Sequence, residues 1–300
     1  MNEDYLTYTA EKADDGVKLD NILKSRMNLS RRLITDLKKA KNIFINNKHV
    51  FTNALVKTGD VVSVNIYKEE SQDIEPENIP IDVVFEDADL LIVNKMPGIV
   101  VHPTKGHPNG TLSNGIIYYL RQKDDKSIVR LVNRLDRDTS GLVIIAKNKF
   151  THQALAKELD SNEISKKYIC IAHGNFTQKS GTIDLPIGRP SRETIKREVM
   201  TSGYKAVTHY KVIEDLDEAS LVELRLETGK THQIRVHMSY IGHPIFGDTL
   251  YGTADDSRFI NRQALHAYML EFNHPRYGSR VRLKTEIPDD MKSLLLKLKV

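Results

Sequence analysis

Two arginines and two aspartates stand within five positions of the chain, directly before an apolar run. The segment reads NRLDRDTSGLVIIAKN, residues 133–148. A carboxylate held beside guanidinium groups is kept ionised, because a nearby cation favours the charged form. Asp136 or Asp138 could therefore act as a nucleophile or a general base. A structural network of Asp and Arg side chains in a turn is the alternative that the spacing leaves open.

A second polar cluster is LETGKTHQIRVHM, residues 226–238, whose second half has the pattern of a helix. His232 and His237 are five positions apart without an acidic residue between them. Helical zinc sites instead place two His four positions apart. We therefore expect no metal here. Arg235, between the two His, would be an ion-pair partner whose purpose the local pattern does not reveal.

The third cluster is ISKKYICIAHG, residues 164–174, in which Tyr168 stands at the head of a predicted strand. A packed tyrosine is the plain interpretation, but an aromatic ring in a cleft can also stack on a nucleobase. Cys170, the only cysteine of the chain, lies in the same apolar run and is interpreted as buried packing rather than a nucleophile. A single cysteine forms neither an internal disulfide nor a cysteine-rich metal site.

These clusters need rigid elements to hold them. The polar cluster is predicted as a loop, and Gly141 marks the point at which this loop meets a buried strand over residues 142–147. Helices are predicted over 111–122, 150–159 and 231–238 and from about residue 289. Strands are predicted for IDVVFED, LLIVNK and GIVVH and over 167–172, 206–213, 221–227, 265–272 and 281–285. Strands outnumber helices without a strict βαβ rhythm, so we predict an α+β domain with a mixed, largely antiparallel sheet.

The first part of the chain has a different composition. Two short helices, over 18–27 and over 30–41 with Ser30 as N-cap, precede two strand-like pieces, NIFINNKHV and VVSVNIY. Between Lys18 and Lys57 there are ten Lys or Arg against two Asp. Five of these cations lie on or just after the second helix: Arg31, Arg32, Lys38, Lys39 and Lys41. A solvated helix face is normally mixed in sign, so this face is predicted to bind phosphate.

The sign of the charge reverses after this basic module. Residues 67–89 contain nine acids against one Lys, and KEESQDIEPENIP, residues 68–80, has the character of an acidic linker. We therefore divide the chain into a tail or short strand over 1–13, the basic module over 14–67, the linker over 68–80 and a larger domain over 81–300.

Bulk composition excludes several classes of protein. The 300 residues are 40% hydrophobic and 28% charged, as in globular proteins. No window approaches the roughly 18 consecutive apolar residues of a membrane span, so none is expected. The acidic, polar start MNEDYLTYTAEKADD lacks the apolar core of a secretory signal. Together with the single cysteine, these features favour a cytoplasmic protein, and we expect a monomer.

The motifs resemble those of a known enzyme family. NRLDRDTSGLVIIAKN, KKYICIAHG and LETGKTHQIRVHMSYIGHPIFGDTLYG are similar, in order and spacing, to three signature motifs of the RluA/RluD-type ribosomal large-subunit pseudouridine synthases. VFEDADLLIVNKMPGIVVHPTKGHPNGTLSNGI resembles that family's opening segment. The basic module resembles the alpha-L (ribosomal protein S4-like) RNA-binding domain. The resemblance extends over residues 14–298.

This resemblance implies an enzyme that isomerises uridine in RNA, above all in large-subunit ribosomal RNA or pre-ribosomal particles, to pseudouridine. The C1′–N1 bond is broken, the base turns and a C1′–C5 bond forms, without a metal or an organic cofactor. The resemblance further implies that Asp136 is the catalytic carboxylate and that Arg235 pairs with it. Tyr168 would pack on the target base and could assist in removing the proton from C5. Arg134 would fill the gap left when the uridine leaves its stack, because a stacked and paired base must be flipped out to react.

The sequence departs from the family pattern at three places. Asn133 stands where the family often has His, NKMPG replaces the commoner NKPAG, and Lys230 replaces an Arg. Because Asp136, Tyr168 and Arg235 are intact, these changes bear on the choice of substrate more than on the chemistry.

Two other functions fit parts of the pattern. The basic module alone would suit a non-catalytic RNA-binding ribosome-assembly factor, against which the intact Asp, Tyr and Arg set argues. Asp136 and Asp138 could be the carboxylate pair of a glycoside hydrolase, but we do not expect them to face one another.

Overall fold

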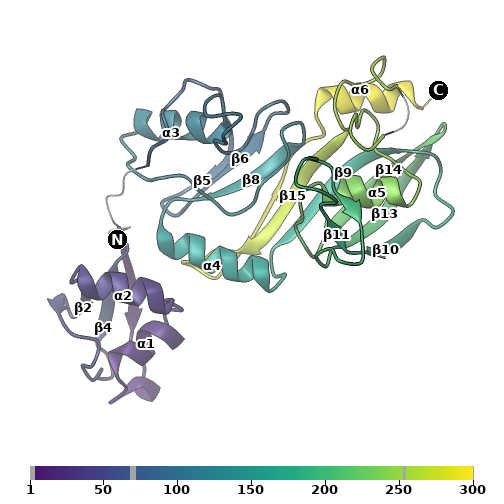
Figure 1. Ribbon diagram of the computed structural model, residues 1–300. Helices are drawn as coiled ribbons and strands as arrows, with labels where there is room; N and C mark the ends of the chain where they lie inside the picture. Colours follow the sequence, from purple (N-terminus) through teal and green to yellow (C-terminus); the bar gives the residue numbers. More distant parts are fainter. Residues whose placement is uncertain (1–3, 68–71, 253–254, 300) are drawn as a thin grey trace.

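The computed structural model describes residues 4–67, 72–252 and 255–299 (Figure 1). A small N-terminal unit lies at one end of a larger domain, beside helix α4 (Lys149–Asp160). Its elements are β1 (Tyr5–Thr9), the 3₁₀ helix η1 (Lys12–Asp14), α1 (Leu19–Ser25), α2 (Arg31–Lys39), β2 (Ile43–Ile45), β3 (Lys48–His49) and β4 (Val61–Asn65). The four strands form one sheet in the order β1-β4-β2-β3.

The small unit has a hydrophobic core of its own. The buried residues of α1 and α2 pack together with those of the sheet: Leu19, Ile22, Leu23, Leu33, Ile34, Leu37, Ile43, Val62 and Val64. The Ser30 hydroxyl accepts a hydrogen bond of 3.1 Å from the backbone N–H of Leu33, so the predicted N-cap of α2 is confirmed.

The N-terminal segment is part of this unit. β1 pairs with β4 in antiparallel register, from Tyr5 opposite Asn65 to Thr9 opposite Val61. The prediction of a strand is therefore confirmed, whereas a separate tail ending at residue 13 is wrong. Leu6 and Ala10 are buried in the core of the small unit, and two buried residues in a largely polar segment gave too weak a periodic signal to place the boundary.

The larger domain is built on a ten-stranded sheet whose main path runs β10-β13-β14-β9-β15-β8-β6-β5, with β16 paired to β15 and β7 paired to β8. Its strands are β5 (Asp82–Glu86), β6 (Leu90–Lys95), β7 (Arg130–Leu131), β8 (Ser140–Ala146), β9 (Ser165–His173), β10 (Ser180–Asp184), β13 (Val207–Leu216), β14 (Ala219–Leu226), β15 (Leu265–Asn273) and β16 (Arg280–Lys284). A separate pair joins β11 (Ile187–Gly188) to β12 (Glu198–Val199). Among these pairings β15 with β8 is parallel and the others are antiparallel, so the predicted α+β class with a largely antiparallel sheet is confirmed.

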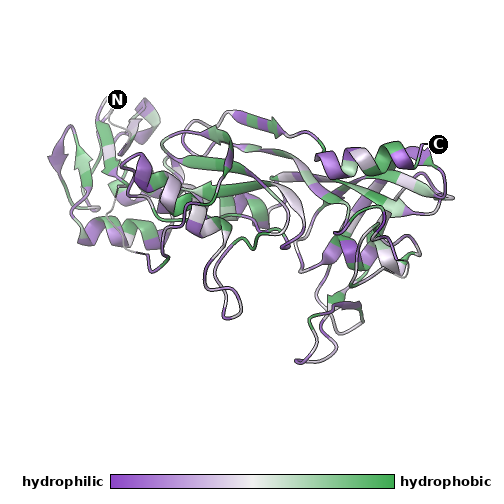
Figure 2. Ribbon diagram, turned by 90° about the horizontal axis from the view of Figure 1, so that it is seen from above, coloured by the Kyte–Doolittle hydropathy of each residue, from purple (hydrophilic) through white to green (hydrophobic). Residues whose placement is uncertain are grey.

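The apolar run after the polar cluster is buried on both faces of the sheet. Every residue of β8 is buried. Val143 and Ile145 pack toward α3 (Leu112–Gln122), whereas Leu142 and Ile144 pack toward α4 on the other face. A strand that is covered on both faces has apolar residues at successive positions, because neither face meets solvent. Figure 2 shows hydrophobic residues along the strands of this sheet and mainly hydrophilic loops around them.

Two predictions, one in the larger domain and one for the linker before it, need correction. GIVVH, residues 98–102, does not form a strand; its backbone instead accepts from the start of α3, where Leu112 N–H donates to Val100 O at 2.8 Å. Residues 72–80 lack regular structure, as a linker should, but they lie against the larger domain. Gln72 exchanges hydrogen bonds with the backbone of Val129, at 2.8 and 3.2 Å, and Ile74 is buried. The rest of the acidic linker, residues 68–71, lies outside the described residues.

Two helices complete the larger domain, α5 (Gln233–Tyr240) and α6 (Asp289–Lys297). In the described part of the chain, no helix is long and apolar enough to cross a membrane.

The small unit is packed onto the larger domain through α4. Phe150 of α4 is buried in the same hydrophobic cluster as the core of the small unit. Ser30 donates a hydrogen bond to Gln153, and the Lys149 ammonium lies 3.5 Å from the Asp36 carboxylate. From the other edge, Arg276 Nη1 donates to the carbonyl of Tyr5 at 2.8 Å.

Candidate functional site

The polar clusters found in the sequence converge on one cleft of the larger domain. The cleft has a volume of about 650 Å³ and is lined by Arg134, Asp136, Tyr168 and Arg235, together with His102 and residues of the turn before α5. His102 and Arg235, 133 positions apart in the chain, thus line the same cavity. The five predicted phosphate-binding cations of the small unit are exposed on and just after α2 and do not line this cleft.

The loop that carries Asp136 is fixed where it enters β8. Gly141 has φ +116°, and a Cβ there would lie 2.3 Å from the carbonyl oxygen of Ala267 on β15. Only glycine fits this parallel contact between β8 and β15. Asn133 binds the edge of β8, because its side-chain oxygen accepts from Ile144 N–H at 2.7 Å and its amide donates to Leu142 O at 3.1 Å. The departure from the family's His at this position therefore leaves the loop anchored.

A buried lysine binds the backbone of the same loop. Lys95, at the end of β6, is 1% exposed, and its ammonium group donates to the carbonyls of Met96, Ile99 and Arg137 at 2.9, 2.9 and 2.7 Å. Burial lowers the pKa of Lys95 to about 7, against the opposing attraction of Asp138. One side chain thus ties the loop of Asp136 to the segment that follows β6.

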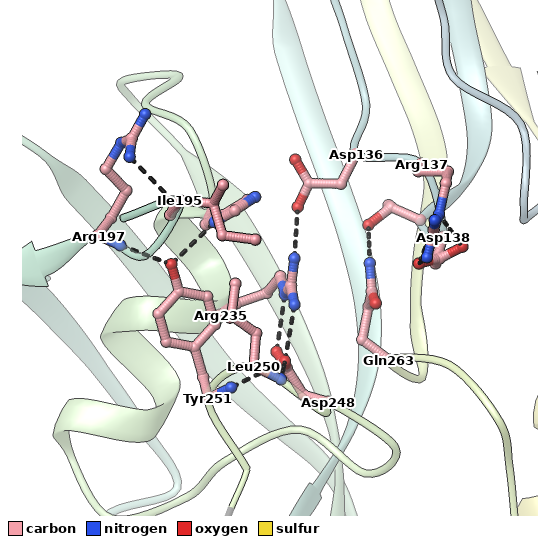
Figure 3. A network of polar contacts seen from close by, with 12 residues as sticks. Asp136, Arg137, Asp138, Ile195, Arg197, Arg235, Asp248, Leu250, Tyr251 and Gln263 are labelled. Carbon is pink, nitrogen blue, oxygen red and sulfur yellow. Dashed lines mark hydrogen bonds and ion pairs between the residues drawn. The ribbon is translucent and has the colours of Figure 1, made fainter. Parts of the chain in front are cut away.

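Arg235 links Asp136 to a second carboxylate (Figure 3). Its Nη1 lies 3.3 Å from Asp136 Oδ2, while Nε and Nη2 each donate to Asp248 at 2.7 Å. The Asp248 side chain is fully buried, whereas that of Asp136 is 26% exposed toward the cleft. Asp248 also accepts from the backbone N–H groups of Leu250 and Tyr251, at 3.0 and 3.1 Å. The guanidinium group is therefore held by Asp248 and offered to Asp136.

Asp138 does not face Asp136. Its carboxylate pairs with the neighbouring Arg137, with Nη2 to Oδ2 at 2.9 Å, on the side away from Arg235 (Figure 3). The separation arises because Thr139 N–H donates to Asp136 O at 3.2 Å and closes a turn; in an extended strand, residues two apart would share a face. The arrangement lacks the facing carboxylates of a glycoside hydrolase; the turn separates them, not the alternation of an extended chain.

Tyr168 lies in the cleft with its side chain turned away from solvent, at 7% exposure. Burial raises the pKa of Tyr168, and the charge of Asp136 raises it further. The ring is therefore present as a phenol at neutral pH. Cys170, two residues further on, is fully buried and burial raises its pKa as well, so its interpretation as packing is confirmed.

The remaining residues of the two clusters have different surroundings. Arg134 is exposed at the cleft. His232 caps α5 in the left-handed region, φ 58°, and its Nδ1 lies 2.8 Å from the hydroxyl of Tyr251. His237 lies between Thr208 Oγ1 and Leu185 O, each at 2.9 Å. Within the described ranges, no group of three or more His, Cys, Asp or Glu is placed to hold a metal ion.

Sequence reasoning missed three polar residues of this site. Asp248 stands 13 positions after Arg235, outside the helix, and only folding shows that the two are paired. Lys95 lies within an apolar strand run. Lys166 lines the cleft, but no feature of the sequence distinguishes it from its neighbour Lys167.

Comparisons with known proteins agree on one family. The family model described as RNA pseudouridylate synthase matches residues 89–240. The chain is 41% identical to an uncharacterized RNA pseudouridine synthase of Bacillus subtilis, YjbO, over 90% of this chain and 95% of that protein. It is 37% identical to the ribosomal large subunit pseudouridine synthase D of Escherichia coli, over 97% and 93% of the two chains. Among solved structures, human RNA pseudouridylate synthase domain containing 1 matches with a TM-score of 0.58 at 28% identity, over 72% of this chain and 86% of that chain.

Proposed function

Since the chain belongs to the RNA pseudouridine synthase family and is thus an enzyme that isomerises uridine in RNA, we propose that Asp136 is the carboxylate that carries out this reaction. The observation that supports this proposal is the placement of Asp136 in the cleft, within 3.3 Å of Arg235 and beside Tyr168. The carboxylate acts on the ribose of a flipped uridine, either at C1′ as a nucleophile or at C2′ as a base.

The neighbouring residues have distinct roles in this proposal. Arg235 positions Asp136 and supplies a positive charge beside it. Tyr168 packs against the uracil ring as a phenol, so the proton that leaves C5 needs an acceptor other than a Tyr168 phenolate. Arg134, exposed at the cleft, occupies the gap in the RNA stack, which offsets part of the few kcal/mol that unstacking costs.

The substrate that fits best is large-subunit ribosomal RNA, free or in pre-ribosomal particles. The support is the relative named for the ribosomal large subunit, which shares 37% identity with this chain over nearly its whole length. The small unit, as an alpha-L domain, contributes phosphate contacts through Arg31, Arg32, Lys38, Lys39 and Lys41, which are exposed. In this proposal the enzyme acts as a monomer in the cytoplasm.

Replacement of one carboxylate tests this function. Asp136→Asn should abolish pseudouridine formation on a uridine-containing ribosomal RNA fragment and leave RNA binding intact. Asp138→Asn is the matched control, because Asp138 is turned away toward Arg137 and should stay active. Full activity of the Asp136 variant would sink the assignment. Mapping pseudouridines in total RNA from a strain that lacks the gene would identify the target, and loss of a site outside large-subunit RNA would overturn the substrate proposal alone.

A further inference from the structure

Two neighbouring lysines of β9 lie in opposite environments. The Lys167 ammonium donates to the carboxylate of Glu223 at 3.0 Å. Lys166 points to the other side of the strand and lines the cleft together with Tyr168, two positions further along. Lys166 is only 8% exposed. Among the residues that the structure describes, none gives its ammonium group a hydrogen bond or an ion pair.

A buried cation without a partner is unfavourable in the free protein. Burial lowers the pKa of Lys166, and a desolvated charge is costly unless it is paired. An apolar side chain of similar length would fill the same space without this cost. The position therefore indicates an anionic or strongly polar partner that arrives with the substrate.

The surroundings of the ammonium group limit where that partner lies. A Cβ at Gly229 would be 3.8 Å from Lys166 Nζ, so the ammonium group lies beside the turn that leads into α5 and Arg235. Along a strand, residues two apart are separated by about 7 Å, which the long lysine side chain can span to reach a ring packed on Tyr168. The phosphates of a flipped nucleotide would instead remain at the mouth of the cleft, near the exposed Arg134.

We propose that Lys166 is a catalytic residue that binds a carbonyl oxygen of the uracil ring and stabilises the negative charge that the base carries after it is released from C1′. This inference rests on the proposed function of the cleft. Whether Asp136 acts at C1′ or at C2′, the C1′–N1 bond breaks with its electron pair on N1, and the charge is shared with O2 and O4. A preorganised donor aimed at such a developing charge is among the strongest contributions to catalysis.

The charge on the base is transient, and the reaction balances without another reactant. C5 of the uracil anion attacks C1′, and the charge returns to the Asp136 carboxylate. If Asp136 is the nucleophile, the bond between C1′ and its carboxylate oxygen breaks as the C1′–C5 bond forms; if it is the base, it gives its proton back to C2′. The proton on C5 is then lost and N1 takes up a proton, which gives pseudouridine. Lys166 donates a hydrogen bond throughout and transfers no proton of its own.

Three variants test this role. Lys166→Met removes the charge with little change in volume, Lys166→Arg keeps a charge, and Lys167→Met is the matched control on the same strand. We expect Lys166→Met to lower the single-turnover rate constant at saturating RNA by about 10²–10³-fold, as for loss of one oxyanion donor, with RNA affinity within about twofold of wild type. Lys166→Arg should recover part of the rate, and Lys167→Met should match wild type.

The outcomes separate this inference from its rivals. If Lys166→Met weakens RNA binding but keeps the rate constant at saturation, Lys166 is a phosphate contact and the proposal is wrong. Wild-type rate and affinity in that variant would also refute it. If Lys166→Met does not fold, the Lys166→Arg variant carries the test. A folded Lys166→Arg variant that forms no more product than the background would count against the proposal. Asp136→Asn, measured in parallel, shows whether the proposed function itself holds.

Discussion

Arg235 is bound more closely by Asp248 than by Asp136. Its two hydrogen bonds to Asp248 are 2.7 Å long, whereas its contact with Asp136 is 3.3 Å. The buried pair fixes the guanidinium group before RNA binds, and the remaining N–H group defines where the Asp136 carboxylate sits. Asp248 is thus a positioning residue that acts through Arg235.

Asp248→Asn should therefore reduce both stability and turnover. Removal of one charge from a buried ion pair costs about 3–5 kcal/mol, and a misplaced reacting group can cost about 10²-fold in rate. The check is thermal unfolding together with single-turnover kinetics below the melting temperature. Asp89→Asn is the control, because Asp89 and Arg276 form a second buried pair, with Nη2 to Oδ1 at 2.8 Å, outside the cleft. Equal loss of turnover in both variants would contradict a positioning role.

Lys95 predicts a specific dependence of stability on pH. Burial holds its pKa at about 7 in the folded protein, against about 10.4 in an unfolded chain. Between these values the unfolded chain binds more protons than the folded one, so the contribution of Lys95 to the free energy of unfolding rises with pH from about 7 to about 10. Lys95→Met should lack this rise and should also lower turnover, because the loop of Asp136 loses its tether. Denaturant unfolding of both proteins at several pH values provides the test; parallel curves would refute the prediction.

The elements that hold the site were predictable where one local signal decides the structure. Ser30 caps α2 as expected, and the apolar run after Gly141 forms a strand buried on both faces. GIVVH was misassigned because its apolar residues fill the space beside α3 without a neighbouring strand, and β-type composition does not report pairing. β1 was underestimated because its partner, β4, lies more than 50 residues away.

Some polar residues of the site could likewise be predicted from the sequence, and others could not. Asp136, Tyr168 and Arg235 were found through motifs, and the structure brings all three to one cleft. Asp248 and Lys95 act through contacts with backbone or side chains that are distant in sequence, which spacing does not show. Lys166 and Lys167 are the clearest case: strand alternation predicts that they point to opposite faces, but only the fold decides which face is the cleft.

The basic face of α2 predicts the salt dependence of RNA binding. Substitution of Arg31, Arg32 and Lys38 by Ala should weaken binding and reduce the slope of log affinity against log salt by about 2–3, because each phosphate contact contributes about 0.7–0.9. A matched control replaces three lysines of the larger domain that are paired with acids: Lys179, Lys292 and Lys299. Fluorescence anisotropy with a labelled RNA fragment at several salt concentrations measures the slope. The same slope in wild type and in the first variant would count against an RNA-binding role for α2.

The burial of Phe150 between the two units predicts that they move as one rigid body. Phe150 belongs to α4 of the larger domain but is buried in the core cluster of the small unit, so it fixes the basic face of α2 relative to the cleft. Phe150→Ala removes most of this contact and should increase the radius of gyration measured by small-angle X-ray scattering. Turnover of long ribosomal RNA fragments should fall more than turnover of short ones, because only the long RNA spans both units.

Leu155→Ala is the control on the same helix. Leu155 is buried against the sheet, and its replacement should destabilise the larger domain by about 2–5 kcal/mol without separating the units. An unchanged scattering curve for Phe150→Ala would show that the remaining contacts, between Lys149 and Asp36 and between Arg276 and Tyr5, are sufficient to hold the small unit in place.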